Sequence, residues 1–168
     1  MAEQPARLSH LDDHGRARMV DISGKDESVR EAVARGRVQI ARETHELLAR
    51  AALPKGDVLT VAKIAGIMAA KRTAELVPMC HPIPLSGIEV RLWLEPGDPP
   101  AVEIEARVRT RAATGVEMEA LTAVSAAALT VYDMCKSAQR DMVIDAIRLV
   151  SKTGGVHGDY LRPGESRP

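Results

Sequence analysis

Residues 88–94 read Ile-Glu-Val-Arg-Leu-Trp-Leu and residues 102–109 read Val-Glu-Ile-Glu-Ala-Arg-Val-Arg, and these two stretches decide the fold class. Apolar residues occupy every second position in both, mostly with charged residues between them, which is typical of strands with one buried and one solvated face. The connection, Pro96-Gly97-Asp98-Pro99-Pro100, favours a turn. The sequence therefore predicts an antiparallel hairpin.

Helical spacing flanks the hairpin on both sides. Asp57 is the predicted N-cap of a helix that runs from Val58 to about Leu76, and a second helix is predicted from Val116 to about Ser137. A shorter helix is expected over Ala41 to Ala52. The stripes expected to face the core are Val61, Ala62, Ala65, Met68, Ala69 and Arg72 in the first helix, and Leu121, Val124, Ser125, Ala128, Leu129 and Tyr132 in the second.

Three further strands are predicted, at Met19 to Ile22, Val33 to Ile40 and Ala146 to Val150. Antiparallel strands with two longer helices indicate an α+β fold, a ferredoxin-like antiparallel sheet with the helices packed on one face. We expect a single domain over residues 1–168, with flexible ends at 1–18 and 157–168, where polar residues, glycine and proline prevail.

Composition excludes several classes of protein. The 168 residues carry 23 basic and 23 acidic side chains, so the basic excess of a nucleic-acid-coating protein is missing. With no Phe, one Trp and two Tyr, the chain cannot build a base-stacking platform. The polar start has no signal-peptide core, no run of about 18 apolar residues suits a membrane, and two cysteines are few for a secreted scaffold. A cytoplasmic protein without nucleic-acid or membrane partners is expected.

Asp133 and Lys136 lie three residues apart in the second predicted helix and so face the same side. Held together, a carboxylate and an ammonium group can share proton transfers. The same spacing also describes an ordinary exposed ion pair, worth a few tenths of a kcal/mol.

Cys80 and His81 stand in a proline-rich stretch, Pro78-Met79-Cys80-His81-Pro82, whose backbone is constrained. The pair could supply an acid–base histidine, a nucleophilic thiol or a metal ligand; a buried structural cysteine beside a hydrogen-bonded histidine explains it equally. No Cys-x-x-Cys spacing supports zinc.

Two carboxylates, Glu117 and Glu119, fall where the second helix begins, and they could cap that helix or accept from guanidine-like N–H donors. Scattered cations become a polyphosphate site only if they converge in one pocket. These cations are Lys25, Arg30, Lys55, Lys71, Arg72, Lys136 and Lys152.

Taken in order along the chain, several segments resemble the cyclic pyranopterin monophosphate synthase family of molybdenum cofactor biosynthesis. They are Met19-Val20-Asp21-Ile22-Ser23, Lys55-Gly56-Asp57-Val58, Ala65-Gly66-Ile67, Ala69-Ala70-Lys71-Arg72-Thr73, Cys80-His81-Pro82, Thr114-Gly115-Val116-Glu117-Met118-Glu119-Ala120-Leu121-Thr122-Ala123 and Tyr132-Asp133-Met134-Cys135-Lys136. The resemblance runs from about His10 to Asp159.

This resemblance implies a lyase that converts 3′,8-cyclo-7,8-dihydroguanosine 5′-triphosphate to cyclic pyranopterin monophosphate and pyrophosphate. It implies a homo-hexamer, a trimer of dimers with active sites between subunits. No cofactor is expected, although Mg²⁺ can accompany the triphosphate, and no dedicated metal site is expected. Carried over by motif, the catalytic residues are Asp133, Lys136 and Lys55, and the substrate-binding residues are Met79, Cys80, His81, Glu117, Met118, Glu119, Lys25, Arg30, Lys71 and Lys152.

Two residues depart from the family pattern: Val156 follows Gly155 where a lysine is frequent, and Ala113 precedes Thr114 where a basic residue is common. Both substitutions thin the cationic wall of the expected pocket. They motivate an alternative in which the chain is a non-enzymatic nucleotide sensor, and the cysteine–histidine stretch leaves a second alternative, a metal-binding protein.

Overall fold

The computed structural model describes residues 12, 14–50, 56–155 and 158–166. In chain order the elements are β1 (Ser28–Gln39), α1 (Arg42–Ala49), α2 (Val58–Ala70), α3 (Thr73–Leu76), β2 (Leu85–Glu95), β3 (Ala101–Ala112), α4 (Glu117–Cys135), β4 (Val143–Thr153) and β5 (Tyr160–Leu161). The predicted hairpin is confirmed as β2 and β3, and Asp57 caps α2 by accepting from the backbone N–H of Thr60 at 3.0 Å.

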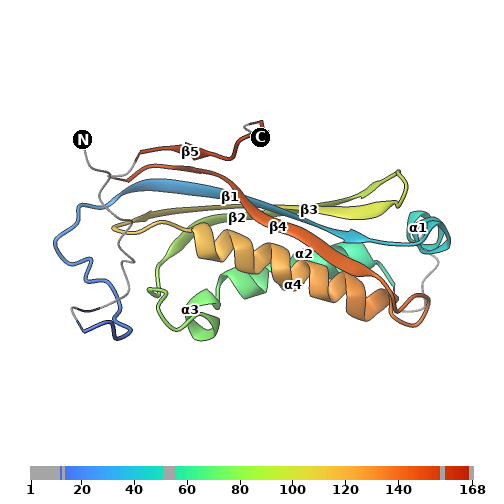
Figure 1. The fold of residues 1–168 in the computed structure, drawn as a ribbon, viewed down its shortest axis with the longest axis horizontal. Coiled ribbons are helices and arrows are strands. Elements are labelled where there is room, and N and C mark those ends of the chain that lie inside the picture. Colours follow the sequence, from blue (N-terminus) through green and yellow to red (C-terminus); the bar gives the residue numbers. More distant parts are fainter. Residues whose placement is uncertain (1–11, 13, 51–55, 156–157, 167–168) are drawn as a thin grey trace.

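The strands form a single sheet in the order β2-β3-β1-β4-β5, and every neighbouring pair is antiparallel. Leaving β5 and the short helices α1 and α3 aside, the order is strand–helix–strand–strand–helix–strand, which is the ferredoxin-like arrangement predicted from the sequence. Helices α2 and α4 cover one face of this sheet (Figure 1).

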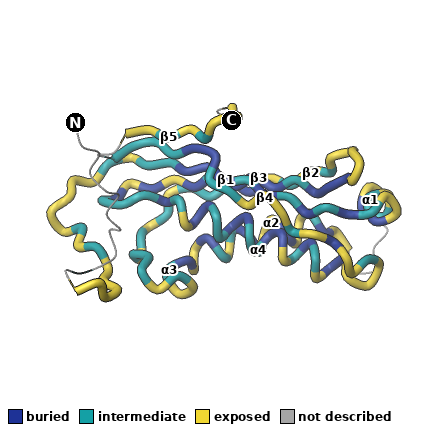
Figure 2. Tube along the Cα trace, in the orientation of Figure 1, coloured by how far each residue is buried: buried dark blue, intermediate teal, exposed yellow. Residues whose placement is uncertain are grey.

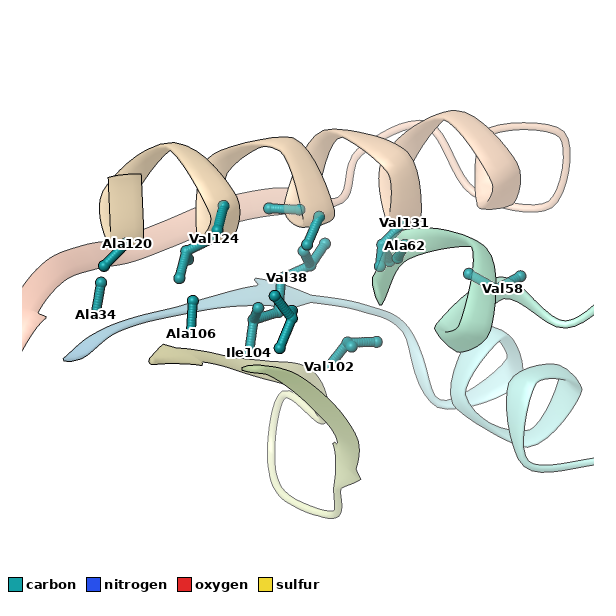
Figure 3. Packing of buried hydrophobic residues seen from close by; sticks show 14 of the residues in the cluster. Ala34, Val38, Val58, Ala62, Val102, Ile104, Ala106, Ala120, Val124 and Val131 are labelled. Atoms are coloured by element: carbon teal, nitrogen blue, oxygen red, sulfur yellow. The ribbon is translucent and has the colours of Figure 1, made fainter. Parts of the chain in front are cut away.

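The core lies between the sheet and the two helices and is built from small aliphatic side chains. Figure 3 shows Val38 of β1 and Ile104 of β3 below α4, with Ala62 of α2 beside Val131. A Cβ on Gly36 of β1 would lie 2.7 Å from Cγ1 of Val124, so β1 approaches α4 more closely than any residue with a side chain permits. The core thus needs few aromatic residues, and Figure 2 shows buried positions along the strands of the sheet and along α4.

The other face of the sheet carries cross-strand ion pairs. Arg37 pairs with Glu103 at 3.1 Å, and Arg35 pairs with Glu105 at 2.7 Å and with Glu165 at 2.8 Å. Glu165 also accepts from Nε of Arg148 at 2.6 Å. The last described stretch of the chain is therefore bound to the open face of the sheet.

The strand predicted at Met19 to Ile22 is not formed. The side chain of Asp21 accepts from the backbone N–H of Ser23 at 2.9 Å and from its hydroxyl at 2.7 Å, and the N–H of Lys25 donates to the carbonyl of Ile22 at 3.0 Å. These local turns use the groups that a ladder would need. The other predicted strands are confirmed but longer, as β1 and β4, and β5 was not predicted.

The predicted helical stripes are partly wrong. Helix α2 stops at Ala70 and α3 follows separately, while Val61 and Met68 are 42% and 49% exposed. Helix α2 instead turns Ala62, Gly66 and Ala70 inward because it lies close against α4. In α4, Val124 and Ala128 are buried as predicted, but Leu129 is 62% exposed. Together, α2 and α4 leave large apolar side chains on their outer faces.

Candidate active site

A cavity of about 430 Å³ opens where α4 begins. Figure 1 places the segment before β1 and the loop before β2 at this same end of the molecule. Nine of the ten predicted substrate-binding residues line the cavity: Lys25, Arg30, Met79, Cys80, His81, Glu117, Met118, Glu119 and Lys152. Four stretches that are distant in sequence thus meet in one place.

The two carboxylates of this cavity differ in their surroundings. Glu117 accepts from Nζ of Lys152 at 2.9 Å, and its carboxylate folds back over Gly115, where a Cβ would overlap it. Glu119 is only 4% exposed. Burial raises the pKa of Glu119; a hydrogen bond from its own backbone N–H partly offsets this, and the charge of Glu117 adds to the rise. The site therefore holds one carboxylate that is paired with an ammonium group and one that retains a proton more readily than usual.

His81 donates from Nε2 to the carbonyl oxygen of Val20 at 2.8 Å. Because a carbonyl oxygen only accepts, Nε2 carries a proton, and Nδ1 is the nitrogen left to accept or release one. This bond also holds the segment before β1 against the cavity, to which it contributes Val20 and Ile22. Sequence reasoning assigned that segment to a strand and missed its role as a wall.

Cys80 has a poor environment for a thiolate. Burial raises the pKa of its thiol, and the negative charges of Glu119 and Glu117 raise it further. A protonated thiol is a weak nucleophile and a weak metal ligand, which argues against the nucleophilic interpretation. In the part of the chain that the structure describes, no three histidine, cysteine or acidic side chains gather to hold a metal ion.

Lys71 lies outside the first cavity, in a neighbouring one of about 320 Å³. His81 and Glu119 line both cavities and so stand between them. Arg72, one of the scattered cations considered from the sequence, also lines the second cavity, and so does Glu75, which the sequence analysis did not name.

The predicted catalytic pair, Asp133 and Lys136, is not in either cavity. Nζ of Lys136 donates to Oδ1 of Asp133 at 2.6 Å, and both side chains are more than half exposed. Asp133 comes sixteen positions after Glu117 in α4, which corresponds to about 24 Å of helix axis at about 1.5 Å per residue. A single chain therefore keeps the pair and the cavity at opposite ends of α4.

Lys55, the third predicted catalytic residue, lies outside the described residues. Gly56, the next residue, precedes α2, whose first turn packs beside the last turns of α4: Figure 3 shows Val58 and Ala62 near Val131. The start of α2 and the Asp133–Lys136 pair thus occupy the same end of the helical layer.

Comparison with known proteins shows the family of this chain. A family model described as "MoaC family" matches residues 19–155. The chain belongs to the MoaC family. The MoaC match extends from before Lys25 to after Lys152 and so contains every predicted site residue.

Curated relatives in the MoaC family are similar along nearly their whole length. A protein named cyclic pyranopterin monophosphate synthase from Pelotomaculum thermopropionicum is 58% identical over 158 residues, which cover 94% of this chain and 92% of the relative. The protein of the same name from Chloroflexus aurantiacus is 58% identical over 163 residues, covering 97% and 99%. That from Nostoc sp. is 54% identical over 158 residues, covering 94% of each.

No helix within the described residues combines the length and the apolar character that crossing a bilayer requires.

Proposed function

We propose that this chain is a cyclic pyranopterin monophosphate synthase whose active site is completed between subunits. The reaction converts 3′,8-cyclo-7,8-dihydroguanosine 5′-triphosphate to cyclic pyranopterin monophosphate with release of pyrophosphate, in molybdenum cofactor biosynthesis. The observation that carries the proposal is the convergence of nine predicted substrate-binding residues on one cavity of a MoaC-family chain.

The polarity of the cavity suits a nucleotide-derived triphosphate. Lys25 and Lys152 supply positive charge for the phosphates and for the charge that develops on the leaving pyrophosphate. Glu119 is placed to accept from the N–H donors of a guanine-derived ring, which are the partners a buried carboxylate needs. Lys71 in the adjoining cavity adds charge on the far side of His81 and Glu119.

Asp133 and Lys136 carry the proton transfers in this proposal, with Lys55 and Nδ1 of His81 as further groups. Ring opening and rebuilding require protons to move at nitrogen and carbon, which needs no redox cofactor. We expect none, and we expect Mg²⁺ only as an ion that accompanies the triphosphate. We expect the protein in the cytoplasm.

The separation of Asp133 from the cavity is the reason to place the site between copies. We expect a homo-hexamer, a trimer of dimers, in which the end of α4 in one subunit reaches the cavity of another. The outer faces of α2 and α4 support such contacts, because Ile64, Met68 and Leu129 are 52%, 49% and 62% exposed.

The direct test is incubation of the purified protein with the cyclic dihydroguanosine triphosphate. We expect pyrophosphate and the pterin product, and we expect Asp133→Asn to abolish both. Binding of the substrate without turnover would instead identify a nucleotide sensor.

Mixed oligomers test the shared site. We expect Asp133→Asn and His81→Ala subunits to be inactive alone. Co-expressed with different affinity tags, they should form some sites that combine the intact Asp133 of one subunit with the intact His81 of another. We expect activity to reappear in the purified mixed oligomer. Failure of every mixed oligomer to turn over, beside an active wild-type oligomer, would place the whole site within one subunit.

A further inference from the structure

The guanidinium of Arg30 is engaged by backbone groups at the edge of the cavity. Its Nε donates to the carbonyl of Ala112 at 3.0 Å, and Nη2 donates to the carbonyl of Ala113 at 3.1 Å. Two neighbouring carbonyls at the end of β3 are thus held by a single side chain from β1, in the forked geometry that only arginine offers.

The turn that follows β4 also lies against the guanidinium of Arg30. The turn after β4 passes so near that a Cβ on Gly155 would overlap Nη1 of Arg30, and a Cβ on Gly154 would overlap the carbonyl of Val29. Both glycines have positive φ, +83° for Gly154 and +89° for Gly155. Arg30 is therefore enclosed between the end of β3 and the turn that ends β4.

The segment fixed in this way leads directly into the carboxylates of the site. Residues 113–115 line the cavity and join β3 to α4, whose first turn holds Glu117 and Glu119. Lys152, three residues before Gly155, bonds to Glu117 at 2.9 Å from the other side. A displacement of the end of β3 would therefore move the carboxylates relative to the cations.

We propose that Arg30, enclosed by Gly155, is a positioning residue that sets the start of α4 in place, rather than a cation that binds the triphosphate. This inference rests on the proposed function for its kinetic consequence but not for its structural one.

Four variants separate the two roles. Arg30→Ala removes charge and bonds, whereas Arg30→Lys keeps the charge but cannot reach both carbonyls. Gly155→Ala removes no charge and crowds the guanidinium. Gly158→Ala is the matched control, because Gly158 also has positive φ, +71°, but its Cβ would meet nothing within 4 Å.

Amide hydrogen exchange without substrate tests the structural part. We expect faster exchange over residues 113–119 in Arg30→Ala, Arg30→Lys and Gly155→Ala, and wild-type exchange in Gly158→Ala. Wild-type protection of 113–119 in Arg30→Lys and Gly155→Ala would overturn the proposal whatever the enzyme's reaction is.

Turnover tests the functional part. If the carboxylates at the start of α4 are displaced, activity falls even though no contact between Arg30 and the substrate has been removed. We therefore expect kcat/KM to fall at least about tenfold in Arg30→Lys and Gly155→Ala. Recovery of wild-type kcat/KM and pyrophosphate affinity by Arg30→Lys would show that the charge alone matters and would refute the positioning role. An inactive wild-type protein with exchange changed as expected would refute the proposed reaction and leave the positioning role standing.

Discussion

Gly66 of α2 lies directly against the backbone carbonyl of Ala123 in α4, at a distance where an added Cβ would come within 2.8 Å of the oxygen. A carbonyl in a helix cannot move as the end of a flexible side chain can, so the helices must separate to admit a methyl group.

The first prediction concerns this contact. Gly66→Ala is expected to lower the free energy of unfolding by about 1–3 kcal/mol, although alanine is the better helix former, because overpacking outweighs propensity. Urea unfolding measures the change. Gly24→Ala is the control, since a Cβ there meets nothing within 4 Å, and an equal or higher stability of Gly66→Ala would contradict the packing argument.

The second prediction concerns Lys136. Lys136→Ala should abolish turnover and leave thermal unfolding and oligomer mass unchanged, because the Asp133–Lys136 pair is more than half exposed and contributes little to stability. Turnover assays and thermal unfolding of the same preparation decide it. Collapse of the fold would give Lys136 a structural role.

The third prediction is a pH dependence set by Glu119. Its pKa is raised in the folded protein, chiefly by burial, so the folded state holds a proton that the unfolded state releases above the ordinary value of 4.5. Stability must therefore fall as the pH rises from 4.5 towards the folded pKa. Glu119→Gln should remove this fall, which denaturation between pH 4.5 and pH 8 measures. The exposed Glu43→Gln variant serves as control, and identical pH profiles for Glu119→Gln and wild type would refute the assignment.

Glu165 provides the fourth prediction, with the opposite sign. Burial opposes ionisation of Glu165, but Arg148 and Arg35 prevail and lower its pKa below the ordinary 4.5. Its contribution to stability is present above that value and is lost as the pH falls through the folded pKa. Glu165→Gln should weaken the protein by about 1 kcal/mol at pH 7, less in high salt, and its profile should converge with that of wild type in acid.

The fifth prediction concerns the outer helical faces. Met68→Glu should reduce the oligomer to smaller species that remain folded and have lost activity, because a charge in an apolar contact between subunits is costly. Light scattering with circular dichroism gives both readings, and Glu43→Lys, a charge change on the exposed side of α1, is the control. An intact active hexamer in Met68→Glu would remove this face from the interface.

The fold could be predicted largely from the sequence because the hairpin alternates strictly and Asp57 marks a helix start. The helical stripes could not, because apolarity alone does not tell which apolar residues face inward. In α2 the small residues Ala62 and Gly66 face α4, and the larger Val61 and Met68 face out. That choice depends on the distance between two helices, which no local pattern contains.

The site was predictable as a set of residues and not as a geometry. The motifs identified most of the side chains that we expected in the site and that line the first cavity. Nothing in the sequence indicated that Lys71 would line a second cavity or that Asp133 would lie at the far end of α4. The local turn of Asp21 with Ser23 was likewise hidden by the apolar neighbours Val20 and Ile22, which suggested a strand.

The length of α4 would make the activity of the enzyme depend on the concentration of the protein. In the proposed site between subunits, the cavity and the Asp133–Lys136 pair lie at opposite ends of α4, so one copy alone would bring together only half of the groups and would need a neighbour for the rest. Specific activity should then decline on dilution below the assembly threshold, and an organism that makes too little of the protein would lose output more steeply than it loses protein.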